Sequence, residues 1–270
     1  MGPVPARPGL AASMRLSDVT RASRDERVEG VQPETGLRGS RNIPEIVSLL
    51  EQAYRSPRHG NLDDPLDELI YIKLSQQTNS AKFSPVYREL RRRFTPWEKL
   101  LAIDGAELAD ILRPLGFHRQ RAKQIQATLR KIQADRGVVD LRSLKDAPID
   151  VSLAYLQNLP GIGVKTAYCV AMYSLGADLL PVDTHVERVS LRLGLIPEHV
   201  ALRSRQGANR EIHSLLEDVI PAASRYSFHV NAVAHGRSVC TTSRPKCRAC
   251  PLRHLCAFHA HARSEAAESE

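Results

Sequence analysis

The chain has 270 residues, 42% of them hydrophobic, which is enough to bury a substantial core in one or two domains. Lys and Arg number 38 against 30 Asp and Glu, and the net charge of +8 favours a polyanionic partner, nucleic acid first. No apolar run approaches the roughly 20 residues of a membrane span, so no membrane partner is expected.

Both ends of the chain are predicted to be disordered. Residues 1–40 form a mildly basic stretch rich in Pro, Gly and Ser, and residues 259–270 are equally without apolar periodicity. An inert linker is our first interpretation of the N-terminal tail, and additional contacts with phosphates are the alternative.

Between the tails the sequence predicts short helices and no strand, which is an all-α class. Asn42 is expected to cap the first helix, and Asp63 or Asp64, followed by Pro65, the second. The T-P-W-E segment at 95–98 is interpreted as a capping box that opens another helix.

A longer helix is expected between two glycines, Gly116 and Gly137, which favour helix ends. Its apolar face carries Ala122, Ile125, Leu129 and Ile132. Its opposite face is expected to be basic and carries Arg119, Arg121, Lys123, Arg130 and Lys131.

The motif L-P-G-I-G-V-K-T-A at 159–167 lies between two apolar helices. Gly161 and Gly163 are expected to allow a turn too tight for side chains, with Ile162 packed back between them. Such a helix-hairpin-helix directs backbone N–H groups outward at a helix N-terminus, where they can grip a phosphate without reading base sequence. An ordinary glycine-bounded turn is the alternative.

Lys165 follows the hairpin at the start of the second helix. The helix N-terminus and partial burial are expected to lower its pKa. A neutral amine can attack an electrophilic carbon and form a Schiff base. The alternative is a solvated lysine that touches a phosphate.

Asp183 lies 18 residues after Lys165, in the segment V-D-T-H-V-E. Its carboxylate could activate the lysine or stabilise a positively charged sugar transition state. Thr184 and Glu187 match a capping box, which would release Asp183 from capping, although Asp183 could itself be the cap. His185 is interpreted as a packing or hydrogen-bonding residue.

Four of the five cysteines, Cys240, Cys247, Cys250 and Cys256, follow the pattern C-x6-C-x2-C-x5-C in a polar, basic stretch. They are expected to hold a metal or to form disulfides. The fifth, Cys169, lies alone in an apolar helix, as a reduced core thiol would, which indicates a cytoplasmic protein and counts against disulfides. Spacing alone leaves zinc and a [4Fe–4S] cluster open.

Together, the hairpin with Lys165, the V-D-T-H segment and the cysteine pattern resemble the endonuclease III-type DNA glycosylases of the helix-hairpin-helix, Gly/Pro–Asp superfamily. The resemblance covers about residues 42–258. It implies two helical lobes with a DNA cleft between them: a six-helix barrel at 62–177, and an iron–sulfur lobe that pairs residues 41–61 with 178–258.

By this resemblance, Lys165 is the nucleophile and Asp183 the catalytic aspartate of a bifunctional glycosylase and AP lyase. It would remove oxidised pyrimidines from double-stranded DNA through a Schiff base and β-elimination. The resemblance also favours the [4Fe–4S] cluster over zinc, with Arg244 and Lys246 on a cluster loop that meets phosphates. A monomer is expected, associated with the nucleoid if the protein is bacterial.

Two further segments match the family. Gln77, in S-Q-Q-T, takes the place of the glutamine that fills the gap left by an extruded base, and Phe117 that of the wedge residue. A core contact is the alternative for Phe117. The residues expected to contact DNA are Gln77, Phe117, His118, Arg119, Gly161, Ile162, Gly163, Arg244 and Lys246.

The chain also departs from the family pattern. The S-Q-Q-T segment is closer to the mismatch-adenine branch, Phe117 stands where many relatives carry leucine, and Tyr168 and Cys169 are unexpected. Two alternatives therefore stay open. One is a mismatch, uracil, thymine or adenine glycosylase on the same scaffold, and the other is a non-catalytic DNA-binding iron–sulfur protein.

Overall fold

The computed structural model describes residues 42–58, 61–200 and 209–261, and these ranges are helical and loop segments without a strand. The all-α prediction is confirmed. No helix in the described ranges is long and apolar enough to cross a membrane. The tail predicted at 1–40 lies outside the described residues; of the one predicted at 259–270, residues 259–261 are helical and the rest lies outside.

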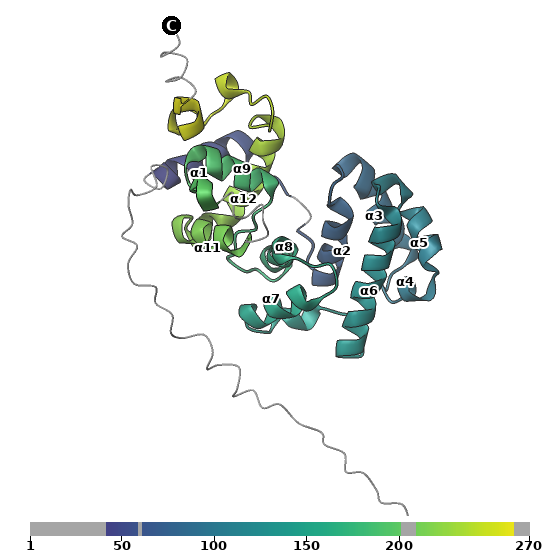
Figure 1. Cartoon of the computed structure of the whole chain (residues 1–270). Coiled ribbons are helices and arrows are strands. Elements are labelled where there is room, and N and C mark those ends of the chain that lie inside the picture. The colour runs from purple at the N-terminus through teal and green to yellow at the C-terminus, as the bar shows by residue number, and fades with distance from the viewer. Residues whose placement is uncertain (1–41, 59–60, 201–208, 262–270) are drawn as a thin grey trace, which may run out of the picture. The chain divides into compact units, whose positions relative to one another are not determined.

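The helices follow one another with short connections (Figure 1). The α-helices are α1 (Ile43–Tyr54), α2 (Pro65–Ser75), α3 (Ser80–Arg93), α4 (Lys99–Ala102), α5 (Gly105–Ile111), α6 (His118–Arg136), α7 (Ile149–Asn158), α8 (Val164–Ser174), α9 (Thr184–Leu193), α11 (Asn209–Val219) and α12 (Ala222–Ser238). Single 3-10 turns are η3 (Arg113–Leu115), η4 (Arg142–Lys145), η5 (Cys247–Ala249) and η6 (Arg253–Leu255).

Buried apolar side chains form two clusters. One is contributed by helices α2 to α8, with Leu69 and Leu129 among its members. The other joins α1, through Ile46 and Leu50, to α9, α11 and α12, where Phe228 is completely buried. In Figure 1, α1 lies beside α12 although most of the chain separates them in sequence. The domain boundaries at 41–61, 62–177 and 178–258 stay predictions.

Capping explains where α2 begins and corrects our expectation for α4. The Asp64 carboxylate accepts hydrogen bonds from the N–H groups of Leu66 and Asp67, at 2.9 and 3.2 Å, as predicted for this position. The capping box at 95–98 is wrong, because α4 begins only at Lys99. The Thr95 hydroxyl instead donates to the carbonyl of Arg91, in the last turn of α3.

Helix α6 ends at Gly137, whose φ of 75° is the left-handed conformation that favours glycine. The expected basic face is wrong in one member, because Arg121 is only 7% exposed. It shares the inner face of α6 with Ile125, four residues on. Its guanidinium donates to the carbonyls of Gly116, Lys73 and Gln76, and so closes the C-terminus of α2.

Candidate active site

A pocket of about 1220 Å³ lies among residues of α2, the loop that follows it, α8, α9 and α12. Both apolar clusters contribute to its wall, for example Cys169 from the first and Val233 from the second. The charged side chains among its described lining residues are Arg58, Lys82, Lys165, Asp183 and Arg237. Four cations against one carboxylate make the pocket attractive to a polyanion.

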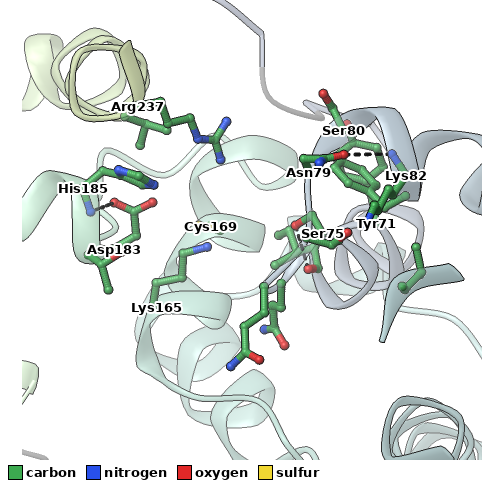
Figure 2. Close-up of a pocket in the computed structure, with 18 of the residues that line it drawn as sticks. Tyr71, Ser75, Asn79, Ser80, Lys82, Lys165, Cys169, Asp183, His185 and Arg237 are labelled. Carbon is green, nitrogen blue, oxygen red and sulfur yellow. Dashed lines mark hydrogen bonds between the residues drawn. The ribbon is translucent and has the colours of Figure 1, made fainter. Parts of the chain in front are cut away.

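Lys165 lies in the first turn of α8 and points into this pocket (Figure 2). Its pKa is raised, because Cys169 and Asp183 favour the ammonium form against the opposing effect of burial. Burial raises the pKa of the Cys169 thiol to about 11, so near pH 7 the thiol is neutral and Asp183 supplies the charge. The expected lowering is wrong, because the partial charge of a helix end is weaker than that of a facing carboxylate.

Asp183 is the N-cap of α9, and its Oδ1 accepts the N–H groups of His185 and Val186 at 2.9 and 2.8 Å. The capping box expected from Thr184 and Glu187 is therefore wrong. Burial alone would raise the pKa of Asp183, but His229, the Val186 N–H and Lys165 outweigh it and hold the pKa low. A carboxylate thus faces an ammonium across the pocket, as Figure 2 shows for Asp183 and Lys165.

Two histidines complete the wall beside Asp183. His229 is buried, and its Nδ1 lies 2.7 Å from the carbonyl of Pro181, so Nδ1 must carry a proton. His185 lies next to Arg188, whose Nη2 is 3.0 Å from its Nδ1. Gly236 on α12 allows this contact, because a Cβ there would lie 2.8 Å from the Cβ of His185. The structure agrees with a packing and hydrogen-bonding role for His185.

The hairpin glycines have different roles. Gly161 has a φ of 71°, and its carbonyl accepts a hydrogen bond from Lys73 Nζ at 3.3 Å. Gly163 has an ordinary φ of −89°, and a Cβ there would meet nothing within 4 Å, so the tight turn does not require it. Ile162 is buried as expected, and its N–H donates to the Leu159 carbonyl at 3.1 Å instead of facing outward.

The two loops expected to enter DNA differ in their relation to the pocket. Gln77 is exposed, has a φ of 52° and lines the pocket. Phe117 is 65% exposed, so the alternative of a core contact is wrong. It caps α6 outside the pocket, followed by the half-buried His118 and the exposed Arg119.

All five cysteines are free, so the disulfide alternative is not realised. Cys169 is buried in the core, as expected, but it also lines the active-site pocket. The other four line one small cavity together, with Arg192 and His235 beside them; they are Cys240, Cys247, Cys250 and Cys256. Arg192, on α9, donates to the Cys240 sulfur at 3.2 Å and to the Thr241 carbonyl at 2.8 Å.

The four sulfur atoms are close enough to influence one another. Burial raises the pKa of Cys250 to about 11, and the charges of Cys256, Cys240 and Cys247 raise it further. Four thiolates in this space would need a cationic centre, so the donor set fits a metal or cluster. Within the described ranges the side chains do not adopt a closed metal-binding arrangement. Arg244 and Lys246 are exposed on the neighbouring loop.

Sequence reasoning missed several residues of the pocket and its floor. They are Arg58, Glu68, Tyr71, Lys82, His229 and Arg237. Glu68 had a usable signal, since it stands in the run L-D-E-L-I-Y-I-K-L, where apolar residues on all sides predict a buried carboxyl group.

Comparisons with known proteins agree with this geometry. Residues 72–216 match the model of the HhH-GPD superfamily of base excision DNA repair proteins. Endonuclease III of Synechocystis sp. is 30% identical over 214 residues, which cover 78% of this chain and 90% of that protein. A solved endonuclease III–DNA complex, described as non-covalent, superposes with a TM-score of 0.70 at 27% identity, covering 83% of this chain and 98% of that one.

A second group of relatives is much longer than this chain. The DNA glycosylase/AP lyase ROS1 of Arabidopsis thaliana is 31% identical over 176 residues, which cover 62% of this chain but only 13% of that protein. The similarity to this group concerns one segment of those proteins.

Proposed function

We propose that this chain, which belongs to the HhH-GPD superfamily of base excision DNA repair proteins and is endonuclease III-like, is a DNA glycosylase with AP lyase activity. One observation carries the proposal: the amine of Lys165 and the carboxylate of Asp183 face each other in a cationic pocket. A sugar bound between them would meet a nucleophile on one side and a negative charge on the other.

The proposed reaction begins with extrusion of the target nucleotide, because its C1′ cannot be reached inside a duplex. Lys165 attacks C1′ as a neutral amine, and the bond between C1′ and the base breaks, with its electron pair leaving on the base. Asp183 stabilises the positive charge that develops on the sugar. The resulting imine acidifies the C2′ proton, so β-elimination can cut the strand.

DNA is proposed to be held by the exposed elements around the pocket. The outward faces of Gly161 and Gly163, at the N-terminus of α8, suit a phosphate, and the open space at Gly163 supports this. Gln77 at the pocket mouth is proposed to enter the gap left by the extruded base, and the exposed Phe117 to wedge the neighbouring stack.

A [4Fe–4S] cluster is proposed at Cys240, Cys247, Cys250 and Cys256. Such a cluster would cross-link the C-terminal loops and balance the charge of four thiolates. Zinc is the competing group, since it also accepts four thiolates. Iron and sulfide analysis of the purified protein, together with visible absorption, distinguishes them, because a zinc protein would be colourless.

Oxidised pyrimidines are the proposed lesions. The glutamine pair Gln76–Gln77 favours a second candidate, a mismatch-type glycosylase, because Gln77 lines the pocket and Gln76 bonds Thr166 on α8 at 3.2 Å. A panel of duplexes, each with one defined lesion or mismatch, separates the two by which base is released.

The decisive test is borohydride trapping on a duplex with an abasic site. The wild-type protein should form a covalent adduct and cut the strand, and Lys165→Gln should do neither. A matched control is Lys99→Gln, outside the pocket. Absence of any adduct with the wild-type protein, across the lesion panel as well, would overturn the proposal and favour a non-catalytic DNA-binding protein.

A further inference from the structure

A glutamate is buried behind the proposed nucleophile. Glu68, on α2, is completely inaccessible to solvent. Its Oε2 accepts a hydrogen bond from the Leu62 N–H at 2.8 Å. Its Oε1 is buried and has no hydrogen-bond partner within the part of the chain that the structure describes. A buried carboxyl oxygen without a donor is costly unless it serves another purpose.

The carboxyl group faces the same side of α8 as the nucleophile. Helices α2 and α8 pack against each other, and Lys165, Cys169 and Tyr173 lie four residues apart on one face of α8. Cys169 hydrogen-bonds Lys165 and is influenced by the charge of Glu68. The thiol therefore lies where a proton can pass between the ammonium of Lys165 and the carboxylate of Glu68.

Other ionisable groups around Glu68 are few and weakly charged near neutral pH. Those coupled to it electrostatically are Asp67 and Tyr71 on α2, Tyr87 on α3, and Lys165, Cys169 and Tyr173 on α8. Charges on the other neighbours of α2 are engaged elsewhere: Arg121 of α6 binds carbonyl groups, Arg142 of η4 pairs with Asp140, and Lys145 is exposed.

We propose that Glu68 accepts the proton that the Lys165 ammonium must lose before it attacks C1′, with the Cys169 thiol as the intermediate carrier. The inference rests on the function proposed above. In this step the N–H bond of the ammonium breaks, the thiol takes that proton while giving its own to Oε1, and a neutral amine and a neutral carboxylic acid result. No oxidant, reductant or further reactant is needed.

Asp183 is less suited to this role than Glu68. Its Oδ1 already accepts two backbone N–H groups, and its pKa is held low, so it is a weak base. Burial raises the pKa of Glu68 to about 7 against the opposing influence of the Leu62 N–H and Lys165, which makes it the stronger base of the two. Asp183 keeps its charge for the sugar, and Glu68 acts through Lys165 as a positioning residue.

The test is the pH dependence of single-turnover trapping by borohydride on an abasic duplex, between about pH 5.5 and 9. In the wild-type protein the trapping rate should rise with pH through an apparent pKa near 7, as the Glu68 carboxylate becomes available. Glu68→Gln, which keeps the size and the bond to Leu62, should trap about 100-fold more slowly above neutral pH and lose this rise.

Two further variants separate proton transfer from structure. Glu68→Asp, which restores a carboxylate, should recover the pH-dependent rise and part of the rate. Glu51→Gln, an exposed glutamate on α1, should behave as the wild type does. Binding of each variant to a duplex with a tetrahydrofuran abasic analogue checks that the fold and DNA affinity are kept.

Each outcome has one meaning. Loss of the rise in Glu68→Gln, with its return in Glu68→Asp, supports the inference. A rise that persists in Glu68→Gln overturns it and leaves the proposed function intact. If Glu68→Gln does not fold, a Glu68→Asp profile without the rise overturns it equally. A wild-type protein that forms no adduct at any pH instead overturns the proposed function.

Discussion

Replacing Glu68 with glutamine should stabilise the protein at neutral and alkaline pH, independently of any activity. The folded structure raises the pKa of Glu68 from 4.5 to about 7, chiefly by burial. Between these values the folded protein binds more protons than the unfolded chain, so the stability contributed by this group falls as the pH rises. Glutamine does not titrate and keeps the shape of the protonated acid.

The magnitude follows from the difference in pKa. At about 1.4 kcal/mol for each tenfold change in the proton equilibrium, a pKa raised by about 2.5 corresponds to about 3 kcal/mol. The free energy of unfolding of Glu68→Gln, relative to wild type, should therefore increase by about 3 kcal/mol between pH 4 and pH 8. All other titrating groups cancel in this difference.

Urea unfolding of the two proteins, at closely spaced pH values with equal m values, measures the difference directly. A wild-type-minus-variant difference that does not change with pH would refute the reasoning, because the carboxyl group would then have the same pKa in the folded and unfolded chains. Glu51→Gln is the matched control and should give a flat difference.

The hairpin and the loops give the remaining predictions. Gly161→Ala should lower the free energy of unfolding by about 1 kcal/mol, because of its left-handed φ. Gly163→Ala should leave stability unchanged and weaken DNA binding, as urea melts and a binding titration would show. Phe117→Ala should not change the melting temperature but should reduce affinity for abasic duplexes more than for intact ones; equal loss on both would contradict a wedge. Arg121→Met should destabilise by about 2–3 kcal/mol, because three buried carbonyl groups lose a charged donor, and a change below 0.5 kcal/mol by urea unfolding would contradict that account.

The features that the sequence predicted well depend on local chemistry. Helix starts and ends at Asp64 and Gly137 follow from capping, and the hairpin follows from its proline and first glycine. The resemblance to endonuclease III-type proteins rested on such motifs and is confirmed. The order and spacing of Lys165 and Asp183 were visible for the same reason.

The features that were missed depend on which helices pack together. Arg121 was assigned to a solvated face because its charge outweighed its position in line with Ile125, and only the packing against α2 provides the carbonyls that justify its burial. The pKa of Lys165 was expected to fall because the charge of Asp183, from a distant segment, was not placed beside it. Local sequence does not contain these distances.

Helix α9 connects the two chemically distinct regions of this protein. Asp183 caps its N-terminus, while Arg188 and Arg192, further along the same ten-residue helix, grip the backbone around Cys240. Such a helix is a stiff strut of about 15 Å, anchored at one end by sulfur-bearing loops. Damage to those loops, by oxidation or loss of whatever they hold, would therefore misalign the carboxylate at the far end without altering any group that touches the substrate.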